Sequence, residues 1–320
     1  MEKIRVAVLM GGPSYEHDVS ILSGKMVCES LNKDRYDVIP VHINRDGEWS
    51  LPFEGLIDKT DITFLALHGE YGEDGTVQQF LDNIGVPYTG SSAQASALGM
   101  NKSASSKLFK AYGLDVPTWT EISRENDWAY FRAPFDYPIV IKPADRGSSI
   151  GVNIIRNEFG TKEALCQVFR VSRNAMIQKY IAGREITCGV IEDESGDIPL
   201  PPTEIFPLRA DFFDYNSKYN FGFAKEITPA PITRREAEEA QRIALAAHKI
   251  IGASGVSRTD MIIGNDGRFH VLEINTIPGF MSAGLLLQAA NHVGLSNSAL
   301  LDKIIASSIK RYEEVTSNKR

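Results

Sequence analysis

The stretch RTDMIIGNDGRFHVLEIN, residues 258–275, decides the fold of the C-terminal part of the chain. Two apolar runs flank residues 264–267 (GNDG), a turn signal that is typical of a β-hairpin. We therefore predict two antiparallel strands here. Residues two apart in a strand point to the same face, so Glu273 and Asn275 project together, and Asp260 can face them across the hairpin.

The polar face of this hairpin has the chemistry of a cation site. Two carboxylates and an amide oxygen are ligands that suit Mg²⁺. A solvated strand face is the alternative, but Val271, Leu272 and Ile274 look buried, and burying carboxylates without a partner is costly. Arg258 lies on the same face as Asp260, where it either stabilises developing negative charge or serves as a structural counter-ion.

A second predicted hairpin lies in the middle of the chain, where apolar runs at 138–143 and 150–155 flank a turn at 144–149. Lys142 lies at the end of the first run, and RGSSIG (146–151) follows it. Glycines let backbone N–H groups approach phosphate oxygens, and serines add donors. This is not a Walker A loop, which has another spacing. Alone the loop could be a plain turn, but beside a strand-borne lysine it indicates phosphate binding.

Residues 175–181 predict a further strand, which runs into a turn or linker at 182–183. Residues 207–231 form a long stretch with little periodicity, which is typical of a functional lid or of disorder. After it, an apolar stripe over 234–251 predicts a helix, and TRRE (233–236) fits a capping box at its start.

The first third of the chain alternates strand-like and helix-like segments. Apolar runs of strand length at 4–10, 37–43 and 61–67, with helical spacing at 19–31, predict a parallel, doubly wound sheet. The loop at 11–13 (GGP) then follows the carboxyl end of the first strand, where such sheets bind ligands.

Two acidic features follow these strands. Glu16 could pair with an ammonium group, or it could simply be a neighbour of a helix N-cap. The Gly-rich, acidic segment 68–76 could position a substrate, or it could be a turn that caps the next helix.

Length and composition narrow the class of protein. A chain of 320 residues, 43% apolar and 23% charged, fits two or three packed globular units. The 41 acidic side chains outnumber the 34 basic ones, which argues against nucleic-acid binding. Cys28, Cys166 and Cys188 form no CxxC pair, so we expect reduced thiols in a cytoplasmic protein. No signal peptide or apolar run of about 18 residues predicts membrane insertion.

Five motifs in order resemble those of the D-alanine–D-alanine ligase family, a branch of the ATP-grasp superfamily, over about residues 4–290. They are GGPSYE with VS (11–16, 19–20), HGEYGEDGT (68–76), KPADRGSSIG (142–151), KY (218–219), and GVSRTD with EINT and PG (255–260, 273–276, 278–279).

The resemblance implies ATP as the nucleotide and two Mg²⁺ ions, or Mn²⁺ in their place. The implied metal ligands are Asp260, Glu273 and Asn275. The implied ATP contacts come from both lobes: Lys102, Lys142 and Ser148 toward the phosphates, Tyr180 and Ile181 beside the adenine, Glu185 on the ribose, and Lys218 over the γ-phosphate.

The resemblance also implies the residues that handle the two amino acids. Glu16 should hold the ammonium group of the first D-alanine, with His68 nearby. The implied catalytic residues are Glu16, Ser148 and Tyr219 as one hydrogen-bonded set, and Arg258 with the Gly279 N–H as donors to the tetrahedral oxyanion. The second substrate is expected beside Ser282 and Gly284.

Some positions depart from the family pattern. Gly284 stands where the family usually has a serine, so the carboxylate of the second substrate would rely on backbone N–H groups, Ser282 or water. Gln178 replaces a glutamate that often contacts the adenine amino group, and its amide oxygen can accept the same hydrogen bond. Thr259 is also atypical. Tyr219 goes with D-alanine rather than D-lactate, and leaves D-serine open.

The fold class that the resemblance implies is α/β with α+β lobes, an ATP-grasp fold behind a doubly wound N-terminal domain. We expect an N-terminal substrate domain over 1–97, a small ATP-grasp lobe over 98–181, and a large lobe with the metal site and a mobile loop over 182–320. The implied reaction joins two D-alanines through an acyl phosphate for peptidoglycan synthesis, in a cytoplasmic homodimer without nucleic-acid or membrane partners. The alternatives are a ligase with another second substrate and a nucleotide-binding protein that has lost catalysis.

Overall fold

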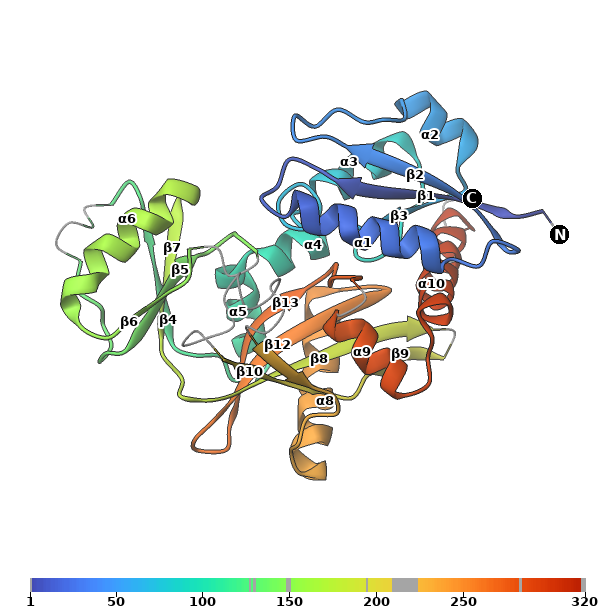
Figure 1. The fold of residues 1–320 in the computed structure, drawn as a ribbon. Helices are drawn as coiled ribbons and strands as arrows, with labels where there is room; N and C mark the ends of the chain where they lie inside the picture. The colour runs from blue at the N-terminus through green and yellow to red at the C-terminus, as the bar shows by residue number, and fades with distance from the viewer. Residues whose placement is uncertain are drawn as a thin grey trace.

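The computed structural model describes residues 2–126, 128, 131–147, 151–193, 195–208, 224–281 and 284–317. Three sheets organise this part of the chain, and Figure 1 shows the four-stranded sheet set apart from the other two. The strands are β1 (Ile4–Gly11), β2 (Tyr36–Ile43), β3 (Ile62–Leu65), β4 (Trp119–Ser123), β5 (Ile139–Pro143), β6 (Asn153–Ile155), β7 (Asn174–Lys179), β8 (Gly183–Asp193), β9 (Gly196–Pro199), β10 (Thr203–Pro207), β11 (Ala224–Ile227), β12 (Val256–Gly264) and β13 (Phe269–Asn275).

The helices cover and connect these sheets. They are α1 (His17–Ser30), α2 (Phe53–Lys59), α3 (Thr76–Ile84), α4 (Ala93–Met100), α5 (Lys102–Ala111), the 3₁₀ turn η1 (Glu158–Gly160), α6 (Thr161–Val171), α8 (Arg234–Ile251), α9 (Leu285–His292) and α10 (Asn297–Ser317). None of the helices in the described part of the chain is long and apolar enough to span a membrane.

The N-terminal sheet has the predicted parallel arrangement. Strand β1 lies between β2 and β3 and is parallel to both, and α1 packs against β1. A side chain at Gly24 of α1 would come within 2.5 Å of Met10, so the glycine permits this close packing. Gly11 ends β1 with a φ of +92°, and a Cβ there would lie 2.3 Å from the Ile43 oxygen. Glycine at position 11 therefore allows the chain to turn toward α1 and places Glu16 at the helix N-terminus.

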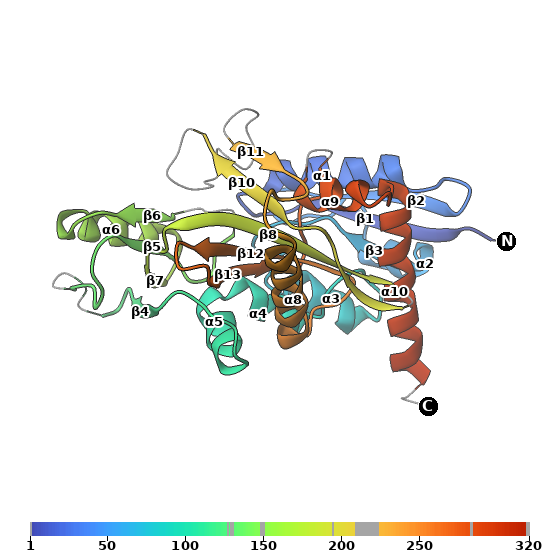
Figure 2. The ribbon, with the colours of Figure 1, turned by 90° about the horizontal axis from the view of Figure 1, so that it is seen from below.

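The C-terminal helix returns to this domain. Leu300, Leu301, Ile304 and Ile305 of α10 are buried in the same apolar core as β1. Figure 2 shows α10 running alongside the N-terminal sheet, and it contacts α1, β3 and β8. The first and last parts of the sequence therefore stabilise one another.

The four-stranded sheet has the order β4-β7-β5-β6 and is antiparallel throughout. Strands β5 and β6 pair as the predicted hairpin, with Ile139 opposite Ile155. Helix α6 packs on this sheet through Leu165 and Val168, which share its core with Ile141. This sheet and α6 form the small lobe.

The six-stranded sheet has the order β11-β10-β8-β12-β13, with β9 paired to β8. The predicted hairpin of β12 and β13 is confirmed, with Asp260 opposite Glu273. Helix α8 begins with the predicted capping box, in which the Thr233 hydroxyl accepts from the Glu236 N–H and the Glu236 carboxylate accepts from the Thr233 N–H.

Two regions bear on the expected domain limits. Helix α5 packs against β13 and α8, so it lies on the six-stranded sheet, while the following chain enters the small lobe. Strand β11 pairs with β10 inside the stretch 207–231 that was expected to be a lid, and residues 209–223 of that stretch lie outside the described residues. The limits at residues 97 and 181 stay predictions.

Candidate active site

A cavity between the small lobe and the six-stranded sheet brings together residues that are far apart in the sequence. The candidate residues that line it are Lys102, Lys142, Tyr180, Ile181, Glu185, Asp260 and Glu273. Three segments supply them: the start of α5, the strands β5 and β7 with the chain after β7, and the strands β8, β12 and β13.

The walls of this cavity suit a flat, partly apolar ligand. They include Val140 and Ile154 of the small lobe and Ile262 of the large sheet, which the sequence analysis did not single out. Leu272, which was expected to be buried, is half-buried and also lines the cavity. Gln178 also lines the cavity, is only 2% exposed, and its Nε2 has no hydrogen-bond partner within the described residues. Since buried polar atoms are normally paired, this amide is suited to a ligand with hydrogen-bonding ring atoms, such as a nucleobase.

The three predicted metal ligands lie together at one end of the cavity. Asp260 accepts two hydrogen bonds from Arg258, at 2.9 and 2.8 Å, and one from the Thr187 hydroxyl at 2.6 Å. The Asn275 amide lies 3.3 Å from the other Asp260 oxygen, and Glu273 pairs with Lys102 at 2.9 Å. Each carboxylate is therefore neutralised by a cation of the chain itself.

The donor set fits an Mg²⁺ ion that is shared with phosphate. No group of three or more His, Cys, Asp or Glu side chains able to hold a metal occurs among the described residues. Two carboxylates and one amide leave coordination positions for water and phosphate oxygens, which is how Mg²⁺ is commonly bound beside a nucleotide.

Lysine charges approach the same end of the cavity. Lys102 is the first residue of α5, is 7% exposed, and donates from Nζ to the Arg146 carbonyl at 2.7 Å. Lys142 on β5 is 6% exposed and also lines the cavity. This arrangement would suit a polyanion that binds together with metal cations. The two nearly buried ammonium groups would pair with the anion, and the two carboxylates would bind the cations.

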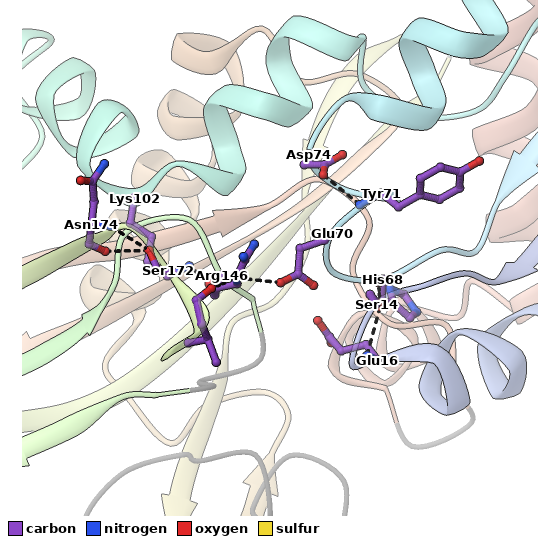
Figure 3. A network of polar contacts seen from close by, with 11 residues as sticks. Ser14, Glu16, His68, Glu70, Tyr71, Asp74, Lys102, Arg146, Ser172 and Asn174 are labelled. Atoms are coloured by element: carbon purple, nitrogen blue, oxygen red, sulfur yellow. Dashed lines mark hydrogen bonds and ion pairs between the residues drawn. The ribbon is translucent and has the colours of Figure 1, made fainter. Parts of the chain in front are cut away.

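The Glu16 region lies beside the loop that ends β5. Glu16 is 5% exposed, and its backbone N–H donates to Ser14 Oγ, which itself donates to the His68 carbonyl (Figure 3). A Cβ added at Gly69 or at Gly147 would lie 2.9 Å from Glu16 Oε2. The Glu16 carboxylate is therefore enclosed by two backbone segments, one at Gly69 in the N-terminal domain and one at Gly147 in the small lobe.

His68 holds a neighbouring loop rather than pointing at Glu16. Its Nδ1 lies 3.1 Å from the Ile277 carbonyl, and its Nε2 lies 2.7 Å from Ser23 Oγ. Burial lowers the pKa of His68, which favours a neutral ring that donates from Nδ1 and accepts at Nε2. Ser23 Oγ also accepts from the Phe280 N–H at 3.3 Å. Ser23 and His68 thus fix the segment that contains Gly279, and no sequence motif pointed to Ser23.

Glu73 holds the same segment from the other side. Its carboxylate accepts from the Gly69 N–H at 2.9 Å and from the Ile277 N–H at 3.4 Å. Burial raises the pKa of Glu73 to about 8, and the negative charge of Glu16 contributes to the rise. The positive charge of Arg258 lowers the pKa of both Glu73 and His68. Arg258 therefore influences the two side chains that hold the Gly279 segment.

We expect the ionisation of Glu73 to make folding stability fall with rising pH. The folded chain keeps a proton on Glu73 that the unfolded chain releases from its ordinary pKa of 4.5 upward. The contribution of Glu73 to stability is therefore fully present below pH 4.5 and is lost as pH rises to about 8. In Glu73→Gln, the free energy of unfolding should fall less between pH 5 and pH 9, as measured by urea denaturation. Glu238→Gln, at an exposed position on α8, should keep the wild-type slope, and equal slopes for all three proteins would contradict this.

The other candidates lie after β13, at the start of α9, or outside the described residues. Gly279 is half-buried after β13, and Gly284 is the buried N-cap residue of α9. Ser148, Lys218, Tyr219 and Ser282 lie outside the described residues.

Comparison with known proteins identifies similar chains over almost the full length. The family model "D-ala D-ala ligase C-terminus" matches residues 108–306, and "D-ala D-ala ligase N-terminus" matches residues 5–56 and 50–91. A D-alanine–D-alanine ligase of Leptospira interrogans is 37% identical, over 96% of this chain and 99% of that protein.

Two solved structures share the fold. A D-alanine–D-alanine ligase from Bacillus anthracis, complexed with ATP, is 35% identical with a TM-score of 0.81, over 98% of this chain and 99% of that one. The VanG D-Ala:D-Ser ligase from Enterococcus faecalis is 31% identical with a TM-score of 0.85, over 96% of this chain and 100% of that one. The expected ATP-grasp fold is therefore confirmed.

Proposed function

Because the chain belongs to the D-alanine–D-alanine ligase family, we propose that the cavity between its lobes is the place where ATP drives the joining of two D-alanines. The enzyme forms D-alanyl-D-alanine for peptidoglycan precursor synthesis and releases ADP and phosphate. One observation supports this assignment of the site. The Asp260 and Glu273 carboxylates line the nucleotide cavity, and the enclosed Glu16 lies close to it.

The first step is a phosphoryl transfer to the carboxylate of the first D-alanine. Glu16 binds the ammonium group of this amino acid, because a nearly buried carboxylate strongly favours a cationic partner. Lys102 and Lys142 neutralise the transferring phosphoryl group, whose charge is spread over its oxygens in the transition state. Bound Mg²⁺, held by Asp260, Glu273 and Asn275, would supply further charge neutralisation at these oxygens.

The second step joins the two amino acids. The amine of the second D-alanine attacks the acyl carbon, and a tetrahedral oxyanion forms before phosphate leaves. The Arg258 guanidinium and the Gly279 N–H donate to this oxyanion, and preorganised donors of this kind are the largest single contribution in many enzymes. Because the acyl phosphate hydrolyses in water, a lid must exclude it. The family resemblance assigns this role to the stretch before β11, where Lys218 is expected over the γ-phosphate and Tyr219 beside Glu16, and both residues lie outside the described part of the chain.

Phosphate release from ATP and Mg²⁺ tests this function. With D-alanine alone, we expect rapid release and a product with the mass of the dipeptide. Release that does not depend on D-alanine would leave only a nucleotide-hydrolysing protein. ATP binding without turnover on any substrate pair would contradict the assignment of an active ligase.

One specific similarity makes D-serine the alternative second substrate to test. The VanG D-Ala:D-Ser ligase is 31% identical to this chain over 96% of this chain's length. In addition, Gly284 stands where the family usually has a serine. Offering D-alanine together with D-serine or D-lactate measures this directly, because the mixed products differ in mass. We propose D-alanine as the preferred second substrate.

We also propose that the enzyme is cytoplasmic and forms homodimers. Light scattering would measure its oligomeric state.

The glycine at position 284 is required by packing, so restoring a serine should lower activity. A Cβ at Gly284 would lie 2.6 Å from the Gly279 oxygen and 2.9 Å from the Met281 oxygen, and both are backbone atoms. The Gly279 segment must then shift, and such overpacking typically costs about 1–3 kcal/mol. We expect Gly284→Ser to reduce kcat/KM by about tenfold or more at unchanged ATP affinity.

The matched control for this prediction is Gly160→Ala, where the nearest atoms are side-chain atoms of Ile155 at 3.3 and 3.5 Å. Its steady-state kinetics with D-alanine should match the wild type. Equal or higher activity of Gly284→Ser would mean that the loop accommodates the hydroxyl group.

A further inference from the structure

An ion pair joins the N-terminal domain to the small lobe at the proposed active site. Glu70 follows His68 and Gly69 in the loop after β3, and Arg146 lies in the loop after β5. The Arg146 Nε and the Glu70 Oε1 are 2.9 Å apart, and Figure 3 shows the two side chains meeting between the two segments. Their side chains are only 27% and 25% exposed.

Arg146 is connected to the nucleotide side of the site. Its carbonyl accepts from Lys102 Nζ at 2.7 Å, and Lys102 pairs with Glu273. Its single Nε–H donates to the Val171 carbonyl at the end of α6, at 2.7 Å, which fixes the side chain to the small lobe and leaves the contact with Glu70 as an ion pair. Arg146 itself lines the nucleotide cavity.

Glu70 is connected to the Glu16 side of the site. Gly69, the residue before it, is packed against Glu16, since a Cβ there would lie 2.9 Å from Glu16 Oε2 and 3.2 Å from Ser14. Gly147, the residue after Arg146, approaches the same Glu16 oxygen just as closely. The pair therefore lies one residue away from both glycines that enclose the Glu16 carboxylate.

We propose that Glu70 and Arg146 are positioning residues, which hold the 144–147 loop of the small lobe against the Glu16 site so that ATP and the first D-alanine are aligned for phosphoryl transfer. This inference rests on the proposed function. Neither side chain needs to touch a reacting atom, since a displacement of about 1 Å in such a site can cost a hundredfold in rate.

The test separates positioning from simple stabilisation. A partly exposed ion pair contributes little to stability, so Glu70→Gln should melt at nearly the wild-type temperature. We expect its apparent KM for D-alanine to rise by about tenfold and its ratio of released phosphate to dipeptide to exceed that of the wild type, because a displaced loop admits water. ATP affinity should be unchanged, because Glu70 does not line the nucleotide cavity.

A double-mutant cycle provides the second measurement. Arg146→Gln should show at least the same kinetic defect, since it also removes the hydrogen bond to the Val171 carbonyl. The double variant should be no worse than the poorer single variant, because the Glu70–Arg146 pair is already lost in each of them. The control is Arg234→Gln with Glu238→Gln, an exposed pair on α8 at 2.7 Å, whose loss should leave the kinetics unchanged. Wild-type KM and wild-type product ratio in Glu70→Gln, or additive defects in the double variant, would overturn the proposal. A wild-type enzyme without phosphate release that depends on D-alanine would instead refute the proposed function.

Discussion

Asp260→Asn should lower the rate of dipeptide formation by about a thousandfold, because removing one preorganised electrostatic group from an active site commonly costs about 2.7–4 kcal/mol of transition-state stabilisation. Asp260 accepts from two nitrogens of the Arg258 guanidinium, Nε and Nη2, and from the Thr187 hydroxyl. An asparagine would present an amide nitrogen to one of these donors and would leave the Arg258 guanidinium without its counter-ion. The same change removes a carboxylate from the proposed Mg²⁺ site, so both proposed steps are affected.

The experiment measures phosphate release and dipeptide over a range of Mg²⁺ concentrations, together with the binding of ATP in the absence of Mg²⁺. We expect the variant to bind free ATP normally and to remain slow at saturating Mg²⁺. Asp266→Asn is the matched control, since Asp266 lies in the turn of the same hairpin and pairs with Arg268 on the surface. If Asp260→Asn kept more than a tenth of the wild-type rate, the metal-binding role of this face would be refuted.

The elements with a strong local pattern could be predicted from the sequence. The alternation of strands and helix over β1, α1 and β2, the capping box of α8 and the β12–β13 hairpin follow from short-range periodicity and turn residues. Strand β8 did not stand out, although it is central to its sheet. Its pairing with β10 and β12 is a tertiary property, which depends on neighbours distant in the sequence.

The same distinction applies to the candidate site. Asp260, Glu273 and Asn275 could be placed together because the two-residue period of a strand and one hairpin turn determine their relative positions. The Thr187 hydroxyl that bonds Asp260 comes from 73 residues earlier, and Ser23, which bonds the Phe280 N–H, lies 257 residues before it. A serine or threonine in a regular helix or strand has no local signal that reveals such a partner.

Glu16→Gln should raise the apparent KM for D-alanine by about a hundredfold, because truncating one partner of a buried charge pair costs about 2–5 kcal/mol. Glu16 is 5% exposed, so solvent cannot replace the lost charge beside the substrate ammonium group. Glu29→Gln is the control on the same helix α1, at an exposed position that should leave the kinetics unchanged. A KM within threefold of the wild type would exclude Glu16 as the ammonium-binding group.

The same variant should be more stable than the wild type at alkaline pH. The charge of Glu16 contributes to the raised pKa of Glu73, so its removal brings the folded-state pKa of Glu73 closer to the ordinary value of 4.5. The folded and unfolded chains then differ less in bound protons, and less stability is lost as pH rises toward 8. Thermal melting at pH 5 and pH 9 would measure this, and a pH dependence equal to that of the wild type would contradict it. A variant that loses substrate affinity while gaining stability would mean that the two neighbouring carboxyl groups are kept for binding, at a cost to the free enzyme.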